Sequence, residues 1–299
     1  MKPPTGEQHV ITRGAARAVI TELAASLREL SIDGVELVQP YPQQGLPPFA
    51  AGLVLVPWPN RVADGRWVLD GVTQQLDITE VDRQNAIHGL LRNGAYRLTE
   101  RTDDSVTLAA AVFPQHGYPF HLETIVRYAL VDDGLEVTHG VTNVGSGTAP
   151  YAVGTHPFLK LGDVPTGELT LVVHAGTHVE ADARLNPIRE HDVAGTEWDL
   201  RTPHRVGELR LDDAFGGVRT LDGVSAVLRA PDGREVRLRQ DHGFGYLQVF
   251  TTNGFPGADV AIALEPMTAP ANAFNSGLGV RWLEPGQSWS VGWGIQYAS

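Results

Sequence analysis

Two polar side chains in apolar surroundings are the first candidates for chemistry. His156 lies in the stretch VGTHPFLKLG, residues 153–162, among apolar residues, Gly and Pro. Glu265 lies in VAIALEPMTAPANAFN, at the end of an almost entirely apolar run. Burying a carboxylate costs free energy unless it is paired, and desolvation raises its pKa toward neutrality, which suits a general base. An imidazole, with an ordinary pKa of about 6.5, suits the matching general acid.

Each candidate also has a purely structural interpretation. His156 could be a core histidine bonded to a carbonyl, and Glu265 could bridge to an arginine or cap loop amides. Arg61 in the stretch PWPNRVADGRW could bind hydroxyls or a carboxylate through its planar fork, or it could be a surface arginine. The residue types alone leave these alternatives open.

The elements that must position these groups are predicted to be short strands. In SWSVGWGIQY, residues 288–297, large apolar side chains alternate with Ser, Gly and Gln, as on a half-buried strand. Residues 122–131 and 135–144 alternate on either side of Asp-Asp-Gly, which predicts a β-hairpin. Many such segments between Gly and Pro turns predict an all-β sandwich or barrel.

Residues 14–37 fit this scheme less clearly. Ala16, Ile20, Leu23, Leu27 and Leu30 are near helical spacing, and the residues between them are good helix formers. The alternative is two strands joined near residues 24–26, which the β-rich context favours. Both interpretations stay open at this stage.

Composition excludes several classes of protein. The 299 residues contain no cysteine, so disulfides, thiolate metal sites and cysteine nucleophiles are excluded. The net charge of −12 and the dispersed basic residues argue against nucleic acid and anionic lipid as partners. No linker or repeat divides the chain, so we expect one domain over residues 1–299. No signal-peptide core is visible near residue 1, so we expect a cytoplasmic protein.

The eleven histidines do not form a recognisable metal motif. His174 and His178 are four residues apart, but HAGTH reads as strand and loop rather than as a helix that presents both rings. His116 and His121 flank a turn, GYPF. We therefore expect no metal. The nucleophile elbow, the P-loop and the dinucleotide fingerprint are also absent from the sequence.

Six blocks in order resemble the aldose 1-epimerase (mutarotase) family. They cover most of the chain: NRVADGRWVLDG, NAIHGLLRNGAYRL, HGYPFHLETIVRYAL, THPFLKLG, LDDAF, and IALEP with PANAFN and LEPGQSW. Each block is weak alone, but their shared order is specific. The resemblance implies an antiparallel β-supersandwich of the galactose mutarotase type, with a sugar cleft and without metal or cofactor.

The resemblance also implies residue roles. Glu265 would take the proton from the anomeric hydroxyl, and His156 would protonate the ring oxygen. We expect the two groups to converge from opposite sides of a shared hollow. Four polar residues would bind the sugar hydroxyls: Asn60, Arg61, His88 and Asp212. Three aromatic residues could stack on the sugar or belong to the core: Trp58, Trp67 and Phe158. The expected partner is one monosaccharide, such as glucose or galactose, bound by a monomer or a homodimer.

The sequence departs from the family pattern in two places. Pro157 and Lys160 stand where sugar mutarotases usually carry other polar or aromatic residues. LDDAF offers two acids, and the register of the motif favours Asp212 over Asp213. The departures leave the acid–base pair intact and the identity of the sugar open.

Three rival functions remain. An epimerase for a phosphorylated or otherwise anionic hexose would need basic residues at the cleft, for which Arg92, Arg97 or Lys160 could serve. A non-catalytic carbohydrate-binding domain could share the fold. A glycosidase would need two carboxylates, which Asp212 and Glu265 could supply in principle.

Overall fold

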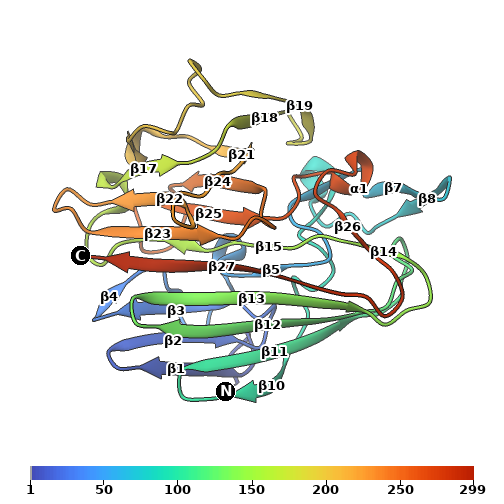
Figure 1. The fold of residues 1–299 in the computed structure, drawn as a ribbon, viewed down its shortest axis with the longest axis horizontal. Helices are drawn as coiled ribbons and strands as arrows, with labels where there is room; N and C mark the ends of the chain where they lie inside the picture. The colour runs from blue at the N-terminus through green and yellow to red at the C-terminus, as the bar shows by residue number, and fades with distance from the viewer. Residues whose placement is uncertain (1) are drawn as a thin grey trace.

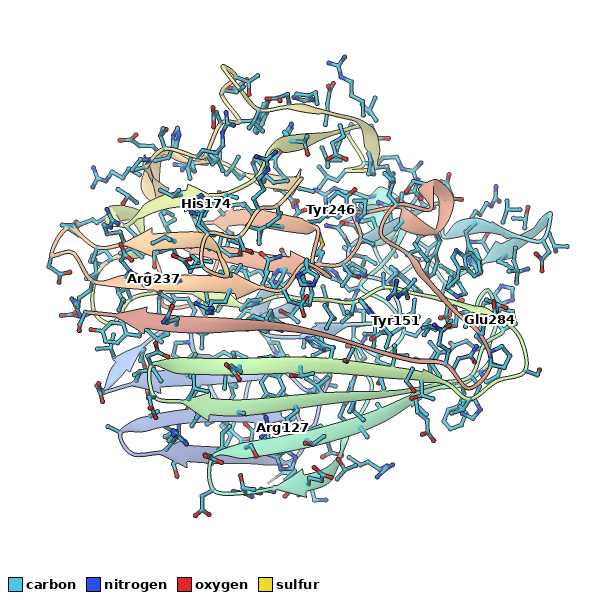
Figure 2. All side chains as sticks on the ribbon, in the orientation of Figure 1. Arg127, Tyr151, His174, Arg237, Tyr246 and Glu284 are labelled. Atoms are coloured by element: carbon cyan, nitrogen blue, oxygen red, sulfur yellow. The ribbon has the colours of Figure 1, made fainter. Side chains whose placement is uncertain are left out.

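The computed structural model describes residues 2–299, and all its paired strands run antiparallel (Figure 1). The largest sheet has nine strands in the order β10 (Arg97–Arg101), β11 (Ser105–Val112), β12 (Leu122–Val131), β13 (Gly134–Asn143), β27 (Ser288–Ala298), β23 (Glu235–Gln240), β22 (Val224–Arg229), β17 (Thr170–Val173) and β20 (His204–Arg205). One face of this sheet is buried and the other is exposed. In β12, Leu122 and Val126 are buried, whereas Glu123 and Arg127 are exposed (Arg127 is labelled in Figure 2).

The second large sheet carries most of the candidate site. Its order is β19 (Pro187–Asp192), β18 (Thr177–Ala181), β21 (Asp212–Gly216), β24 (Tyr246–Thr252), β25 (Ala261–Met267), β15 (Gly154–Thr155) and β5 (Val54–Leu55), and β16 (Phe158–Leu159) also pairs with β25. All seven residues of β25 are buried. In Figure 1, β18 and β19 lie at the opposite end of the molecule from the N-terminal strands.

The remaining elements are short. A third sheet has four strands: β1 (Gln8–Arg13), β2 (Ala16–Thr21), β3 (Leu27–Ile32) and β4 (Val35–Glu36). Three pairs complete the strands: β6 (Arg61–Ala63) with β9 (Asn85–Ile87), β7 (Arg66–Leu69) with β8 (Val72–Gln75), and β14 (Ala149–Tyr151) with β26 (Arg281–Leu283). The helices are η1 (Pro48–Ala50), η2 (Val81–Arg83), η3 (Thr166–Glu168), η4 (Val206–Glu208) and α1 (Ala273–Ser276). Among the described residues, no helix has the length and apolarity needed to cross a membrane.

The buried faces of the large sheets pack on one another. One continuous apolar cluster includes Leu130 of β12, Leu238 of β23 and Leu264 of β25. Sheets pack face to face in this way because each has one apolar face to remove from water. The all-β antiparallel fold predicted from the sequence is confirmed, whereas a single domain over residues 1–299 stays a prediction.

The hairpin around Asp-Asp-Gly is also confirmed, since Val131 of β12 pairs with Gly134 of β13. In β27, Val291, Trp293 and Ile295 are buried as their spacing predicts.

Residues 14–37 form strands, so the helical interpretation of this segment is wrong and the two-strand alternative is confirmed. Ala24 and Ala25 have φ of 50° and 45°, in the left-handed region, and they break the chain between β2 and β3. Five of the six residues of β2 are buried, including the β-branched run Val19, Ile20 and Thr21. A surface helix would have buried only one stripe of this segment, so burial between sheets overrides the helical spacing.

Candidate active site

His156 and Glu265 lie side by side on neighbouring strands. Glu265 is in β25, and His156 stands between β15 and β16, which both pair with β25. Phe158 pairs with Ala263, so the register brings His156, two residues earlier, opposite Glu265, two residues later. His156 Nε2 is 3.3 Å from Glu265 Oε1. The sequence-based expectation that the two groups approach from opposite sides of a hollow is therefore wrong, because adjacent strands bring them into direct contact.

Burial sets the protonation of this pair. His156 is 6% exposed and Glu265 is 2% exposed. Burial raises the pKa of Glu265 well above its ordinary value; the nearby Asp212 raises it further, and Arg61 opposes both. Burial also lowers the pKa of His156 to about 4. Between these two shifted pKa values, the pair holds a single proton.

The pair has unused hydrogen-bonding capacity. Within residues 2–299, the buried atoms Glu265 Oε2 and His156 Nδ1 have no hydrogen-bond partner, and neither has Nδ1 of His88. Buried polar atoms almost always have partners, so three orphaned atoms close together call for a specific explanation. A polar ligand in the adjoining cavity would provide such partners.

That cavity has a volume of about 480 Å³, and all six site residues predicted from the sequence line it. It is lined by Phe49, Ala50, Asn60, Arg61, Thr79, Glu80, Arg83, Ile87, His88, Arg92, His156, Asp212, Gln248, Phe250 and Glu265. These residues come from β21, β24 and β25, from β6 and β9, and from η1, η2 and the loops beside them. A cavity of this size, with polar groups that converge on it, is typical of a small-molecule site.

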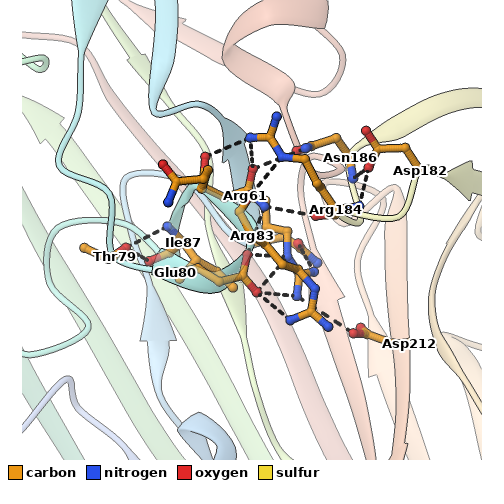
Figure 3. Close-up of polar contacts among 12 residues, drawn as sticks. Arg61, Thr79, Glu80, Arg83, Ile87, Asp182, Arg184, Asn186 and Asp212 are labelled. Atoms are coloured by element: carbon orange, nitrogen blue, oxygen red, sulfur yellow. Dashed lines mark hydrogen bonds and ion pairs between the residues drawn. The ribbon is translucent and has the colours of Figure 1, made fainter.

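Arg61 is held in place by a carboxylate that the sequence analysis did not identify. Its guanidinium donates Nε to Glu80 Oε2 at 2.9 Å and Nη2 to Glu80 Oε1 at 3.0 Å (Figure 3). Burial raises the pKa of Glu80, but the hydrogen bonds from Arg61 and Asn85 outweigh it, and the net pKa is below the ordinary value. Arg61 Nη2 is also 3.8 Å from Asp212 Oδ2, so the arginine lies between two acids.

A chain of amides joins Arg61 to Asp212 by a second route. Arg61 Nη1 donates to Asn60 Oδ1 at 3.1 Å, and Asn60 Nδ2 donates to Gln248 Oε1 at 3.2 Å. Gln248 Nε2 then donates to Asp212 Oδ1 at 2.8 Å. Gln248 pairs with Glu265 across β24 and β25, so it also stands beside the acid–base pair. Gln248 was not predicted from the sequence, although a glutamine in the apolar run YLQVF is a usable signal.

His88 directly follows β9, and its ring lies next to that of His156. Its backbone has φ of 66°, and its N–H donates to the carbonyl of Asn60 at 2.8 Å. Its ring meets the ring of His156 edge-on, with centroids 5.6 Å apart. Burial lowers the pKa of His88 well below the ordinary value, and the charges of Arg92 and Arg61 lower it further, so the ring is neutral.

The two adjacent acids of LDDAF have different surroundings. Asp212 lines the cavity, and burial raises its pKa despite the neighbouring Arg61. Asp213 turns away and contacts Nε2 of His178 at 2.8 Å. The register that favoured Asp212 as the residue facing the cleft therefore agrees with the geometry.

The matching family model, described as aldose 1-epimerase, covers residues 7–296. The chain belongs to the aldose 1-epimerase family. It is 33% identical over 284 residues to an uncharacterized protein, YihR, of Escherichia coli strain K12, covering 95% of this chain and 91% of that one. This family consists of isomerases that act on sugars.

Solved structures show the same fold. A GalM/aldose epimerase homologue from C. elegans superposes with a TM-score of 0.84 at 17% identity, covering 98% of this chain and 99% of the other. A galactose 1-epimerase from Lactobacillus acidophilus NCFM superposes with a TM-score of 0.80 at 19% identity, covering 97% and 94%. At this level of identity the likeness shows the fold alone, and it agrees with the supersandwich predicted from the sequence.

None of the three aromatic residues considered for sugar stacking in this aldose 1-epimerase family member lines the cavity. Trp58 and Trp67 belong to the main apolar core, so the core alternative applies to both. Phe158 stacks on His156 with centroids 5.3 Å apart and helps to desolvate it. The aromatic rings that line the cavity are Phe49 and Phe250, which the sequence analysis did not select.

Of the three basic residues considered for an anionic sugar, only Arg92 lines the cavity. Lys160 pairs with Glu36 at 2.6 Å, and Arg97 lies in the exposed edge strand β10. Arg92 donates Nη1 to the carbonyl of Ile87 at 3.3 Å and forms no ion pair with any residue in the described part of the chain.

The histidine pairs considered for metal binding do not form a metal centre. No group of three or more His, Asp and Glu side chains in residues 2–299 is arranged to hold a metal ion. His174 (labelled in Figure 2) follows β17, whereas His178 lies in β18 and bonds to Asp213.

Proposed function

We propose that this protein interconverts the α and β anomers of a free aldohexose, such as glucose or galactose, by opening and closing the sugar ring. The observation that carries the proposal is the 3.3 Å contact between His156 Nε2 and Glu265 Oε1 at a cavity with orphaned polar atoms. Membership of the aldose 1-epimerase family supports the same reaction.

The reaction needs only proton transfers. The carboxylate of Glu265 accepts the proton of O1 while the protonated ring of His156 donates one to O5. The C1–O5 bond breaks, its electron pair stays on O5, and a C1–O1 double bond forms. Rotation about C1–C2 presents the other face of the aldehyde, and the reverse transfers close the ring as the other anomer.

The protonation of the pair suits this sequence of events. One proton on the pair is enough for both tautomers: carboxylic acid with neutral imidazole, or carboxylate with imidazolium. Burial favours the neutral tautomer in the empty site, while Arg61 favours the carboxylate form of Glu265. A positioned acid or base contributes about 10²–10⁴-fold, and orientation of both groups adds to it.

The polar residues around the pair would bind the sugar. In this proposal Arg61 binds sugar hydroxyls through its remaining N–H groups, and Asp212 binds them through its carboxylate oxygens. His88 and Asn60 complete this set of four residues, which we call the polar wall. Phe49 and Phe250 cover the apolar C–H faces of the ring.

Polarimetry tests the proposal directly. Fresh α-glucose and α-galactose are dissolved with the wild-type protein, with the Glu265→Gln variant and with buffer alone. We expect the wild type to accelerate the decay of optical rotation and the variant to lose most of that acceleration. A protein that binds these sugars without accelerating the decay would instead be a carbohydrate-binding domain.

A second candidate substrate, a phosphorylated or otherwise anionic hexose, is favoured by Arg92. Its half-buried guanidinium lines the cavity and forms no ion pair within residues 2–299; burial lowers its pKa, although the charge of Glu80 opposes this. An anionic group on the substrate would supply the missing partner. Comparison of kcat/KM for glucose and for glucose carrying a phosphate separates the two substrates, and Arg92→Gln should lower the value only for the anionic one.

Several further expectations stay predictions: a cytoplasmic location, the absence of nucleic-acid and membrane partners, the absence of a cofactor, and a monomeric or homodimeric state.

A further inference from the structure

The hairpin of β18 and β19 lies just outside the candidate active site. None of its residues, 177–192, lines the cavity. The hairpin nevertheless contacts residues that hold two of the sugar-binding groups. Its turn contacts the residues that hold Arg61, and β18 contacts the residue that holds Asp212. By contrast, His156 and Glu265 are positioned by β25 and the strands that pair with it.

The turn is fastened to the loop after η2 by Arg184. Its guanidinium donates Nε to the carbonyl of Arg83 at 2.9 Å and Nη2 to the carbonyl of Gln84 at 2.9 Å (Figure 3). Nη2 also contacts Asp64 Oδ1 at 2.7 Å. A rigid guanidinium that satisfies two carbonyls and a carboxylate fixes two chain segments relative to each other.

Asn85 connects this turn to the carboxylate that holds Arg61. Asn85 is fully buried; its Nδ2 donates to Glu80 Oε2 at 2.9 Å and to the carbonyl of Arg184 at 3.0 Å. Its Oδ1 accepts a hydrogen bond from Asn186 Nδ2 at 3.2 Å. Two residues, Asn85 and Glu80, therefore separate the hairpin turn from the guanidinium of Arg61.

β18 reaches Asp212 independently. His178 Nε2 donates to Asp213 Oδ1 at 2.8 Å, and Asp213 Oδ2 accepts the backbone N–H of Asp212 at 3.0 Å. The ring of His178 is stacked on Trp198 with centroids 4.0 Å apart and planes 3° apart, which fixes its orientation.

We propose that the β18–β19 hairpin positions the sugar-binding side of the site. Its turn holds Arg61 through Asn85 and Glu80, and its first strand holds Asp212 through Asp213. Arg184 and His178 are positioning residues in this account, because neither lines the cavity. The inference rests on the proposed function in one respect, the assignment of Arg61 and Asp212 to sugar binding.

The test compares two arginines of the same hairpin. Arg184→Ala removes the link to the loop, whereas the control Arg189→Ala removes an exposed ion pair with Glu180 at 2.6 Å, and neither Arg189 nor Glu180 lines the cavity. We expect Arg184→Ala to raise KM for the sugar roughly fivefold, as for the loss of a hydrogen bond, with kcat nearly unchanged. Arg189→Ala should match the wild type, and equal KM values for all three proteins would overturn the proposal.

Double variants separate positioning from general damage. Because the guanidinium of Arg184 holds the loop that carries Asn85, and Asn85 binds Glu80, the combination of Arg184→Ala with Glu80→Gln should raise KM by less than the product of the two single effects. The combination with His178→Ala should raise KM by the full product, since that route ends at Asp212. Full multiplication in the first pair would contradict the route through Glu80.

Hydrogen exchange without sugar provides a readout that does not depend on turnover. Amides of residues 79–88 should exchange faster in Arg184→Ala than in Arg189→Ala, while β12 and β13 should be unchanged. Unchanged exchange in residues 79–88 would refute the proposal even if the enzyme is active. If the wild type does not interconvert the anomers of any sugar, the proposed function is wrong. The exchange result then decides by itself whether the hairpin holds residues 79–88 in place.

Discussion

His139 in β13 and His156 before β16 are both buried imidazoles, but their surroundings differ. His139 Nε2 accepts a hydrogen bond from Trp293 Nε1 at 3.0 Å in the core of the nine-stranded sheet. His156 Nε2 instead contacts the carboxyl group of Glu265 at 3.3 Å, beside a cavity of about 480 Å³. Burial lowers the pKa of both rings, to about 3 for His139 and to about 4 for His156.

This comparison shows that burial and a shifted pKa do not by themselves mark a functional histidine. Both are consequences of desolvation, which acts on any core imidazole. What distinguishes His156 is a partner that can exchange a proton with it and a space in which a substrate could reach both groups.

Removal of the acid–base pair should have the largest effect. Glu265→Gln and His156→Asn should each lower kcat by about 10²–10⁴-fold, because each removes one proton-transfer group and keeps similar volume. Polarimetric rates with fresh α-glucose measure the loss, and circular dichroism confirms the fold. A Glu265→Gln enzyme with near-normal kcat would refute the assignment.

Acidification should act next most strongly. As pH falls through about 4, the pair gains a second proton and has no base, so kcat/KM should fall about tenfold per pH unit. As pH rises past the raised pKa of Glu265, the pair loses its last proton and has no acid. Between these limbs the profile should be flat. An acid limb that begins near 6.5 instead of near 4 would mean that His156 is not desolvated in the working enzyme.

Changes in the binding wall should be smaller and confined to KM. Arg61→Ala should raise KM roughly 10- to 100-fold, the value of a hydrogen bond to a charged group, and Asp212→Ala should act in the same direction. Steady-state kinetics on a panel of aldoses measures both. A fall in kcat with unchanged KM would move these residues from binding to the chemical step.

His139→Phe should have the smallest effect on activity. The change leaves Trp293 Nε1 without an acceptor, so the free energy of unfolding should fall by about 1–3 kcal/mol at neutral pH. Urea denaturation measures that loss, and mutarotation rates at the same pH should equal those of the wild type. Lost activity in a folded His139→Phe protein would erase the distinction between the two histidines.

The sequence identified the main groups of the site because each was polar where its surroundings were apolar. His156, Glu265 and Arg61 stood out in this way, and the family resemblance added His88 and Asp212. Glu80 was missed because it lies in an ordinary polar stretch. Its carboxylate reaches Arg61 only because Glu80 bridges to Asn85 of β9, and β9 pairs with β6. Gln248 was missed because its importance depends on its pairing with Glu265.

The local pattern also determined the fold class, since alternation with a period of two specifies strands wherever one face must be buried. It could not decide residues 14–37, where helical spacing and β-branched residues conflict and only packing against neighbouring strands resolves the choice. Tertiary structure alone decided that His156 and Glu265 touch rather than face each other across a gap. Contacts between strands far apart in the chain depend on register and sheet order, and a one-dimensional pattern of residue types does not contain them.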